Sequence, residues 1–320
     1  MSITPIISKT PIPYTVFGGS QKARVHKYLF GLSIVVLHRS GRLNRDNALS
    51  ELAGNRNFEI ISIEGPEAAP EIEGLVKKYP DIRFILLHEK SSYGEKINLA
   101  IEEAQSKLVL VVWSDMHIPL SSLADRLIEK INDHDILCSV PILKTARHET
   151  VPSVQVPVRI KKQLKIVPWN PLRDGMKSIF PFDYVGVYNK EKYRFTGGFD
   201  PCITSPYWQK ADFGFRSFLW NQEIQVNTSL YFHYRDALAP ENQTPDEGYK
   251  LFYLKNMSVD FRNDRGHLSI RRFPSYMINS GVGWLRAFRE FRQVQKWVIR
   301  HKYRYKEDAK SLIELWEPPE

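Results

Sequence analysis

The sequence predicts an α/β domain with a mostly parallel sheet flanked by helices, and two observations support this prediction. First, four short and nearly continuous apolar runs, as expected of strands buried on both faces, lie at residues 33–38, 58–63, 83–87 and 108–113. Second, the intervening segments place apolar residues at helical spacing, at residues 42–52, 70–79 and 93–104. This alternation begins near residue 30 and is typical of a single α/β unit.

The second half of the chain is less regular. It predicts helices at 123–131 and 206–220, an exposed antiparallel ribbon within 154–167, and strands at 136–143, 182–188 and 226–234. From residue 239 onward, prolines and then a basic helical pattern change the composition. We therefore divide the chain into an N-terminal extension (1–29), an α/β domain (30–238) and a basic, mainly helical C-terminal extension (239–320).

Composition excludes several classes of protein. The chain has 320 residues, of which 42% are hydrophobic and 12% aromatic, so it is not a disordered or low-complexity protein. Two cysteines, Cys138 and Cys202, are too few for a disulfide scaffold or a Cys-rich zinc module, and we expect both to be reduced thiols. The net charge of +9 indicates an anionic partner: nucleic acid, a phosphorylated ligand or an acidic membrane surface.

No segment of the sequence has the pattern of a membrane span or a secretory signal. The longest apolar run, residues 108–113, is far shorter than the roughly 20 residues that cross a bilayer as a helix. The first 15 residues contain three prolines and no basic region followed by an apolar stretch. We therefore expect a cytoplasmic protein, with peripheral contact to the inner face of the membrane as an option.

The first candidate site is Ser114-Asp115-Met116-His117, directly after the fourth apolar run. In open α/β sheets, ligands bind outside the carboxyl ends of the strands. Asp115 and His117, two residues apart, can turn toward one divalent metal that neutralises a diphosphate leaving group. The alternative is that Asp115 caps a helix starting near Pro119 and that His117 is a loop residue without a role.

Two further residues belong to the same expected edge. Glu64 ends the second apolar run, where its carboxylate can accept hydrogen bonds from a nucleobase or a ribose. Lys96 lies on the helix that leads into the fourth run and can reach a phosphate. The alternatives are an exposed loop acid for Glu64 and a solvated helix face for Lys96.

A second constellation lies between residues 195 and 216. Gly198 permits close backbone approach to a ligand, and Tyr207 and Trp208 can stack on a sugar or a base. Asp212 can act as a general base on an acceptor hydroxyl, or simply pair with Arg216 one helical turn later. Downstream, His233 ends a strand-like segment. It can be a third metal ligand, or it can be an ordinary histidine of the core or of a strand edge.

Taken in order, seven segments resemble the GT-A nucleotide-sugar glycosyltransferases, particularly the family-2 type. The segments are SIVVLHRS, FEIISIEG, YGEKINLAIEEA, LVLVVWSDMHI, FTGGFD, WQKADFGFR and YFHYRD. They span residues 30 to 236, about two-thirds of the chain. The resemblance implies a Rossmann-like GT-A sheet.

The resemblance also implies roles for particular residues. The loop after the first strand contacts the nucleotide, and the acid after the second strand reads the base. The Asp-x-Asp motif binds metal and diphosphate, an Asp in a Glu-Asp pair is the base, and a later His completes the metal shell. In this sequence, the loop corresponds to His38, Arg39 and Ser40, and the acid that reads the base corresponds to Glu64. The metal-binding motif corresponds to Asp115 and His117. The base corresponds to Asp212, and the later histidine to His233.

This sequence departs from the family pattern at three positions. His117 replaces the second aspartate of Asp-x-Asp, a variant known in the related polypeptide N-acetylgalactosaminyltransferases, which retain anomeric configuration. Ala211 replaces the first acid of Glu-Asp, and Glu64 stands where Asp is commoner.

The function that the resemblance implies is transfer of a hexosyl or N-acetylhexosaminyl group from a nucleotide sugar, most commonly a UDP-sugar. The acceptor would be a hydroxyl of a glycan or a lipid-linked molecule, as in polysaccharide biosynthesis. The reaction would be inverting and would use Mn²⁺ or Mg²⁺. Two alternatives stay open. One is a non-catalytic nucleotide- or glycan-binding homologue. The other is a sugar-nucleotidyltransferase with a Gly-rich phosphate loop at residues 17–24.

The basic segment 284–305 combines an apolar stripe at helical spacing with many cations. Residues 281–306 hold eight Lys/Arg and one Asp/Glu, a net charge of +7. Three interpretations stay open. The stripe packs on the domain, or the helix lies on an anionic membrane, or it binds an anionic polymer. Nucleic acid ranks last because the sequence shows no nucleic-acid-binding module.

Overall fold

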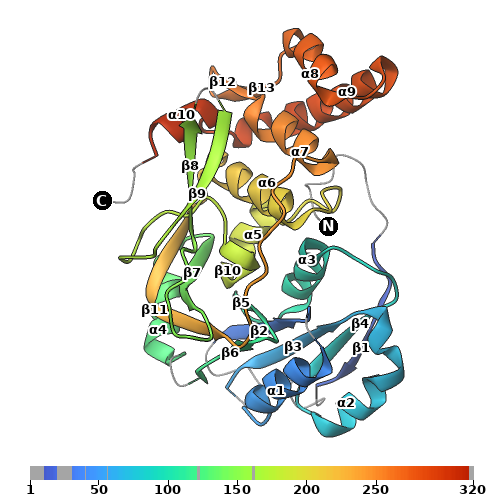
Figure 1. Cartoon of the computed structure of the whole chain (residues 1–320), viewed down its shortest axis with the longest axis vertical. Helices are drawn as coiled ribbons and strands as arrows, with labels where there is room; N and C mark the ends of the chain where they lie inside the picture. The colour runs from blue at the N-terminus through green and yellow to red at the C-terminus, as the bar shows by residue number, and fades with distance from the viewer. Residues whose placement is uncertain are drawn as a thin grey trace.

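The computed structural model describes residues 11–19, 31–39, 41–55, 57–120, 123–160 and 163–316. Within these residues, one nine-stranded sheet with the order β1-β4-β3-β2-β5-β10-β7-β11-β6 forms the centre of the fold (Figure 1). Its strands are β1 (Tyr14–Gly18), β2 (Leu32–Leu37), β3 (Glu59–Glu64), β4 (Arg83–Leu87), β5 (Leu108–Trp113), β6 (Met116–His117), β7 (Cys138–Lys144), β10 (Gly186–Asn189) and β11 (Ile224–Tyr234).

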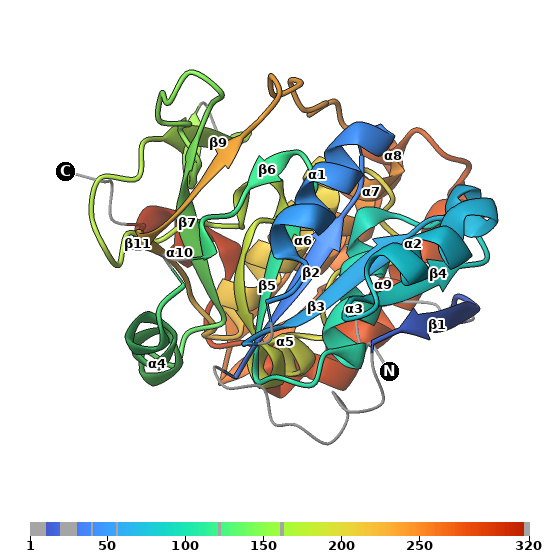
Figure 2. The same ribbon diagram turned by 90° about the horizontal axis from the view of Figure 1, so that it is seen from below.

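The four apolar runs of the first half form the parallel centre of this sheet. β2 pairs with β3 and β5, and β3 pairs with β4, all in parallel. Every residue of β2, β3 and β5 is buried, because helices cover both faces (Figure 2). The predicted mostly parallel α/β sheet is confirmed.

Five connecting helices lie where the pattern predicts them: α1 (Arg42–Leu52), α2 (Ile72–Lys78), α3 (Tyr93–Glu103), α4 (Asp125–Asp133) and α6 (Pro206–Leu219). The short helix α5 (Lys190–Thr196) is not among the predicted elements. α3 begins at a capping box: the Ser92 hydroxyl accepts from the Glu95 amide, and Glu95 Oε2 accepts from the Ser92 amide at 3.0 Å. This cap positions the first turn of α3, which carries Lys96.

Three strands run against the parallel direction. β1 pairs antiparallel with β4 at one edge, β10 lies antiparallel between β5 and β7, and β6 pairs antiparallel with β11 at the other edge. The predicted strand at 182–188 is partly wrong. Residues Phe182–Tyr184 form a 3-10 turn in which Asp183 has φ 52°, and the strand starts only at Gly186. The predicted exposed ribbon is β8 (Val154–Ile160) paired with β9 (Gln163–Trp169).

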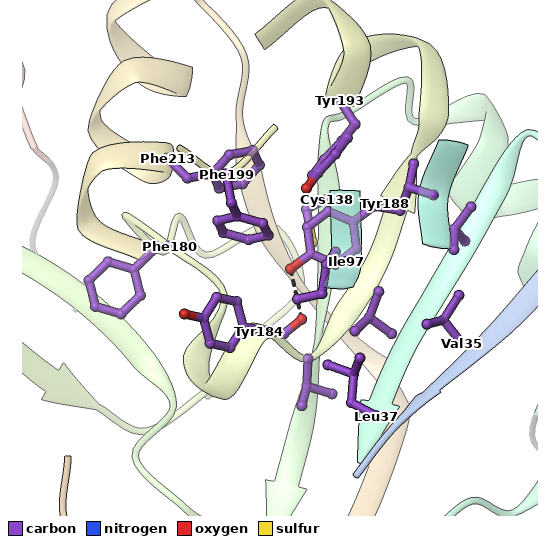
Figure 3. Close-up of a cluster of buried hydrophobic side chains, with 14 of the residues drawn as sticks. Val35, Leu37, Ile97, Cys138, Phe180, Tyr184, Tyr188, Tyr193, Phe199 and Phe213 are labelled. Carbon is purple, nitrogen blue, oxygen red and sulfur yellow. Dashed lines mark hydrogen bonds between the residues drawn. The ribbon is translucent and has the colours of Figure 1, made fainter. Parts of the chain in front are cut away.

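An aromatic cluster joins the sheet to α5 and α6 (Figure 3). Tyr184, Tyr188, Tyr193, Phe199 and Phe213 are buried there, with ring centroids between 4.5 and 6.4 Å apart in the contacting pairs. The Tyr188 hydroxyl donates to the Tyr184 carbonyl at 2.7 Å, so its polar end is satisfied. This cluster holds the loop before β10 rigidly against the sheet.

The C-terminal extension packs against α6 and shares its core. It contains α7 (Glu247–Phe252), a π-helical turn (Tyr253–Met257), a hairpin of β12 (Asp260–Arg262) and β13 (Arg265–His267), α8 (Phe273–Ser280), α9 (Trp284–His301) and α10 (Ala309–Glu314). α8 and α9 stand at the end of the molecule away from α1 and α2 (Figure 1). Among the described residues, no helix combines the length and apolarity needed to traverse a bilayer.

Candidate active site

The carboxyl ends of β2, β3 and β5 bring the predicted donor-site residues to one edge of the sheet. Because β2 lies between β3 and β5, the residues that follow β2 lie between Glu64 and Asp115. His38 Nε2 lies 2.8 Å from the Ser62 hydroxyl and 3.2 Å from Glu64 Oε1. The predicted clustering of these residues is therefore present in the structure. Ser40 lies outside the described residues.

Glu64 is a buried carboxylate that is stabilised in its charged form. Burial alone would raise its pKa, but His38, the Ser62 hydroxyl and Arg45 lower the pKa to about 2. Lys96, in the first turn of α3, has no ion-pair partner among the described residues. Burial lowers the pKa of Lys96, and Glu67 and Glu64 oppose that effect. An ammonium group without a paired carboxylate at this edge suits an incoming phosphate.

Arg39 joins two carboxylates across the centre of the site. Its Nε donates to Asp115 Oδ2 at 2.9 Å, and its Nη1 contacts both Asp183 oxygens at 2.7 and 2.8 Å. The guanidinium carbon also lies 4.3 Å from the centre of the Trp113 ring. Burial opposes the charge on Arg39, but the two carboxylates outweigh it and raise the pKa of the guanidinium. Arg39 is therefore a fixed cation that neutralises Asp115.

Asp183 is a site residue that the sequence reasoning missed. Its backbone is left-handed, with φ 52°, and its carbonyl accepts from Trp113 Nε1 at 2.8 Å. Its carboxylate accepts from the Tyr234 hydroxyl at 2.8 Å as well as from Arg39. Burial raises the pKa of Asp183, although Arg39 and Lys210 oppose the shift. A non-glycine residue held with positive φ among charged partners is a recurrent sign of function, but the sequence shows only one more acid in a loop.

The two histidines proposed as metal ligands face each other across a strand pair. His117 on β6 and His233 on β11 are direct antiparallel partners, and their ring centroids are 6.5 Å apart. Burial lowers the pKa of His233, with His148, Lys144 and His117 acting in the same direction. Its buried Nδ1 has no hydrogen-bond partner in the described part of the chain. A neutral imidazole with an unused nitrogen suits metal coordination.

The third proposed metal ligand, the carboxylate of Asp115, is oriented differently from the two histidines. Asp115 points to Arg39, and His117 Nδ1 contacts Glu51. Among the described residues, no three His, Cys, Asp or Glu side chains are arranged to hold a metal together. The donor set of one carboxylate and two imidazoles fits Mn²⁺ chemically. In this conformation, Arg39 supplies the positive charge beside Asp115.

The structure argues against Asp212 as the general base. Its side chain is fully buried, ion-paired with Arg216, 3.0 Å from Lys255 Nζ and 2.9 Å from Asn256 Nδ2. Burial alone would raise its pKa, but the two cations lower it. A general base must reach the proton that it removes, and here the carboxylate faces the protein interior. The alternative pairing with Arg216 is the one that the structure contains.

Three other residues that were predicted to contact a ligand, Gly198, Tyr207 and Trp208, contact other parts of the protein instead. Gly198 has φ +71°, and a Cβ there would meet Asn98 Oδ1 at 2.4 Å, so its close approach is to α3. Tyr207 and Trp208 are 5% and 8% exposed, which leaves no open ring face for stacking. Trp208 instead stacks on Phe252 and donates to the Thr244 carbonyl at 3.0 Å. In this conformation, Trp208 anchors the C-terminal extension, and Tyr207 packs on Phe180 and Trp208.

The loop proposed as a phosphate cradle lies at the wrong edge in its described part. Gly18 pairs with Arg83 at the start of β4, and the Gly19 amide donates to the Ile82 carbonyl. Both glycines therefore lie at the amino ends of the parallel strands, opposite the Asp115 edge. Residues 20–24 lie outside the described residues.

No protein-family model matches the chain, and no curated protein matches it in sequence. Among solved structures, GalNAc-T7 crystallised with UDP, GalNAc and Mn²⁺ has a TM-score of 0.56 and 11% identity, over 84% of this chain and 56% of that one. The fold is GT-A. S. aureus TarS in complex with UDP-GlcNAc has a TM-score of 0.47 and 14% identity, over 84% and 72% of the two chains. The chain spans little more than half the length of GalNAc-T7.

Proposed function

We propose that this protein is a glycosyltransferase that takes a sugar from a nucleoside diphosphate sugar. UDP is the first nucleotide to test. The observation that carries the proposal is the placement of Asp115, paired with Arg39, at the carboxyl edge of a GT-A sheet, where β6 and β11 also bring His117 opposite His233. In such sheets this edge is where ligands bind. The acceptor is a hydroxyl of a glycan or a lipid-linked molecule, and the transferred group is a hexosyl or N-acetylhexosaminyl unit.

The donor roles follow from position and charge. His38 and Glu64 offer an imidazole and a carboxylate to the base and ribose, and Ser40 continues the same loop. Lys96 contributes an unpaired ammonium toward the diphosphate. Asp115, His117 and His233 would hold Mn²⁺ or Mg²⁺. When bound, that ion would offset the charge of the departing diphosphate.

For the acceptor proton we propose Asp183 in place of the predicted Asp212. Asp183 is 16% exposed and pairs with one cation, Arg39, and burial raises its pKa. Asp212 is fully buried and enclosed between two cations, Arg216 and Lys255. A carboxylate with a raised pKa is the stronger base. Asp183 would take the hydroxyl proton while the oxygen attacks the anomeric carbon opposite the leaving group, which inverts the configuration.

The first experiment is calorimetric titration of UDP and GDP, each with and without Mn²⁺. We expect wild type to bind UDP more tightly with Mn²⁺ and Asp115→Ala to lose that metal-dependent gain. Asp81→Ala is the matched control, because Asp81 is exposed and precedes β4 at the opposite edge of the sheet. Absence of nucleotide binding at millimolar concentration in wild type would overturn the proposal.

A second experiment tests the base. Asp183→Asn should lower turnover by about 10²- to 10⁴-fold with UDP binding retained. An unfolded Asp183→Asn would fail to bind UDP, so the binding assay separates the two causes. Full turnover in Asp183→Asn would exclude Asp183 as the base.

A donor-binding protein without turnover is the second candidate. The pairing of Asp115 with Arg39 and the enclosure of Asp212 favour it, because neither carboxylate is free in this conformation. It predicts nucleotide binding without release of UDP from UDP-sugars in the presence of glycan acceptors.

A sugar-nucleotidyltransferase would instead catalyse pyrophosphorolysis of a nucleotide sugar. Gly18 and Gly19, which belong to the loop predicted to bind its phosphates, do not lie at the Asp115 edge.

A further inference from the structure

The helix α9 is only half covered by the protein. Its buried side carries Ala287, Phe291, Val294, Trp297 and Val298, which confirms that part of the apolar stripe packs on the domain. Four other large apolar side chains of α9 are exposed, with exposed fractions of 44% to 63%: Trp284, Leu285, Phe288 and Ile299. Exposed apolar side chains that share one side of a helix usually indicate an interaction surface.

The same open side of α9 is basic. Arg289, Arg292, Lys296 and Arg300 are all exposed, and no carboxylate among the described residues pairs with them. At helical spacing, these cations fall beside the exposed apolar residues and away from the buried side. The one acid of the helix, Glu290, is pointed elsewhere and bonds to Arg286 and Tyr276 at 2.8 and 2.9 Å. The open surface therefore carries positive charge only.

The helix before α9, which packs against it, also carries exposed apolar and basic residues. α8 carries Ile278, which is 75% exposed, and the turn before it carries Ile270 at 47% and the exposed Arg271. α8 and α9 together form one end of the molecule, away from β1–β4 (Figure 1).

We propose that the α8–α9 end, defined by the exposed residues above, docks on the surface of an anionic lipid bilayer. Apolar side chains next to unpaired cations, with a tryptophan among them, suit the boundary between headgroups and acyl chains. Long Arg and Lys side chains reach anionic headgroups while their stems stay with the apolar residues. A second copy fits poorly, because two such surfaces would oppose cation to cation. This proposal does not depend on the proposed transferase activity.

The test is co-sedimentation of the full chain with vesicles, without any nucleotide present. We expect binding to phosphatidylcholine vesicles that contain phosphatidylglycerol, weak binding to phosphatidylcholine alone, and loss of binding at high salt. The double variant Arg289→Gln/Lys296→Gln should weaken binding by roughly thirtyfold. Its matched control is Lys77→Gln/Lys107→Gln, which removes the same charge from exposed positions elsewhere and should bind like wild type.

A second pair of variants separates apolar insertion from plain electrostatics. Trp284→Ala/Phe288→Ala should weaken binding at least roughly tenfold, whereas Leu172→Ala/Leu315→Ala, which removes side chains that are 64% and 77% exposed, should not. Thermal unfolding of each variant shows that the fold is retained, because all these positions are exposed.

Several outcomes would overturn the proposal. One is equal binding of wild type to neutral and anionic vesicles, or no binding to either. Another is an equal loss of binding in the control pairs. A third is a concentration-dependent dimer, or tight binding of RNA, that Trp284→Ala/Phe288→Ala abolishes while vesicle binding is absent. Failure of UDP binding would contradict the proposed function but would leave this result unaffected.

Discussion

Two clusters of carboxylates and cations in this protein have the same chemistry and opposite surroundings. At the sheet edge, Arg39 bridges Asp115 and Asp183, and the three side chains are 23%, 8% and 16% exposed. Beneath α6, Lys255 bridges Asp200 and Asp212, and all three side chains are fully buried. The first cluster borders solvent through Arg39 and Asp183, whereas the second is enclosed by protein. Exposure, rather than residue type, therefore separates the candidate site from a structural network.

The largest expected effect breaks the buried cluster. Asp212→Asn leaves Arg216 and Lys255 buried with one carboxylate fewer, which should reduce the free energy of unfolding by about 3–5 kcal/mol. Asp115→Asn, in the partly exposed cluster, should cost less, about 1–2 kcal/mol, because Arg39 is 23% exposed and keeps Asp183 as a partner. Urea unfolding of both variants measures the difference. Equal losses of unfolding free energy in the two variants would mean that the difference in exposure does not distinguish the two clusters.

An intermediate effect concerns Glu64, which is buried like the second cluster but lies at the edge of the first. Its pKa is lowered from 4.5 to about 2 in the folded state, so its charged form stabilises the fold above pH 4.5. That contribution, about 3 kcal/mol at neutral pH, is lost as the pH falls from about 4.5 to about 2. Urea unfolding of wild type and Glu64→Gln gives the free energy of unfolding of each protein at each pH. Plotted against pH, the two sets of values should converge at low pH. Curves that stay parallel would show that the carboxylate charge contributes nothing.

The smallest expected effect is at an ion pair outside both clusters. Arg194 and Glu102 form a bidentate pair at 2.8 and 3.0 Å, but both side chains are about half exposed. Arg194→Gln should change the free energy of unfolding by less than about 0.5 kcal/mol, because water replaces the lost partner. A loss above about 1.5 kcal/mol would show that exposure is a poor guide to the value of ion pairs here.

The fold was predictable where local pattern and tertiary environment agree. β4 and β5 have the predicted bounds, because buried parallel strands leave nearly continuous apolar runs in the sequence. The short antiparallel β10 was placed too early, since the turn at Asp183 depends on its contacts with Arg39 and Trp113 rather than on its own sequence. Distant partners override local preference at such a position.

The candidate site was only partly predictable for the same reason. His38 ends a predicted strand, Glu64 and Asp115 come just after predicted strands, and the sheet order brings them together. Asp183 lies in a loop with no motif, so only the folded chain places it beside Arg39. Asp212 matched a motif position, yet its orientation into the core depends on Lys255, which lies 43 residues later.

The sequence by itself determined the α/β alternation, the carboxyl edge where a ligand can bind and the amphipathic character of α9. These properties follow from patterns that repeat within a few residues. The tertiary structure alone decided which carboxylates stay open, which side of α9 is covered, and that Arg39 neutralises Asp115. Burial and ion pairing depend on residues far apart in the chain, and no local pattern records which of them will meet.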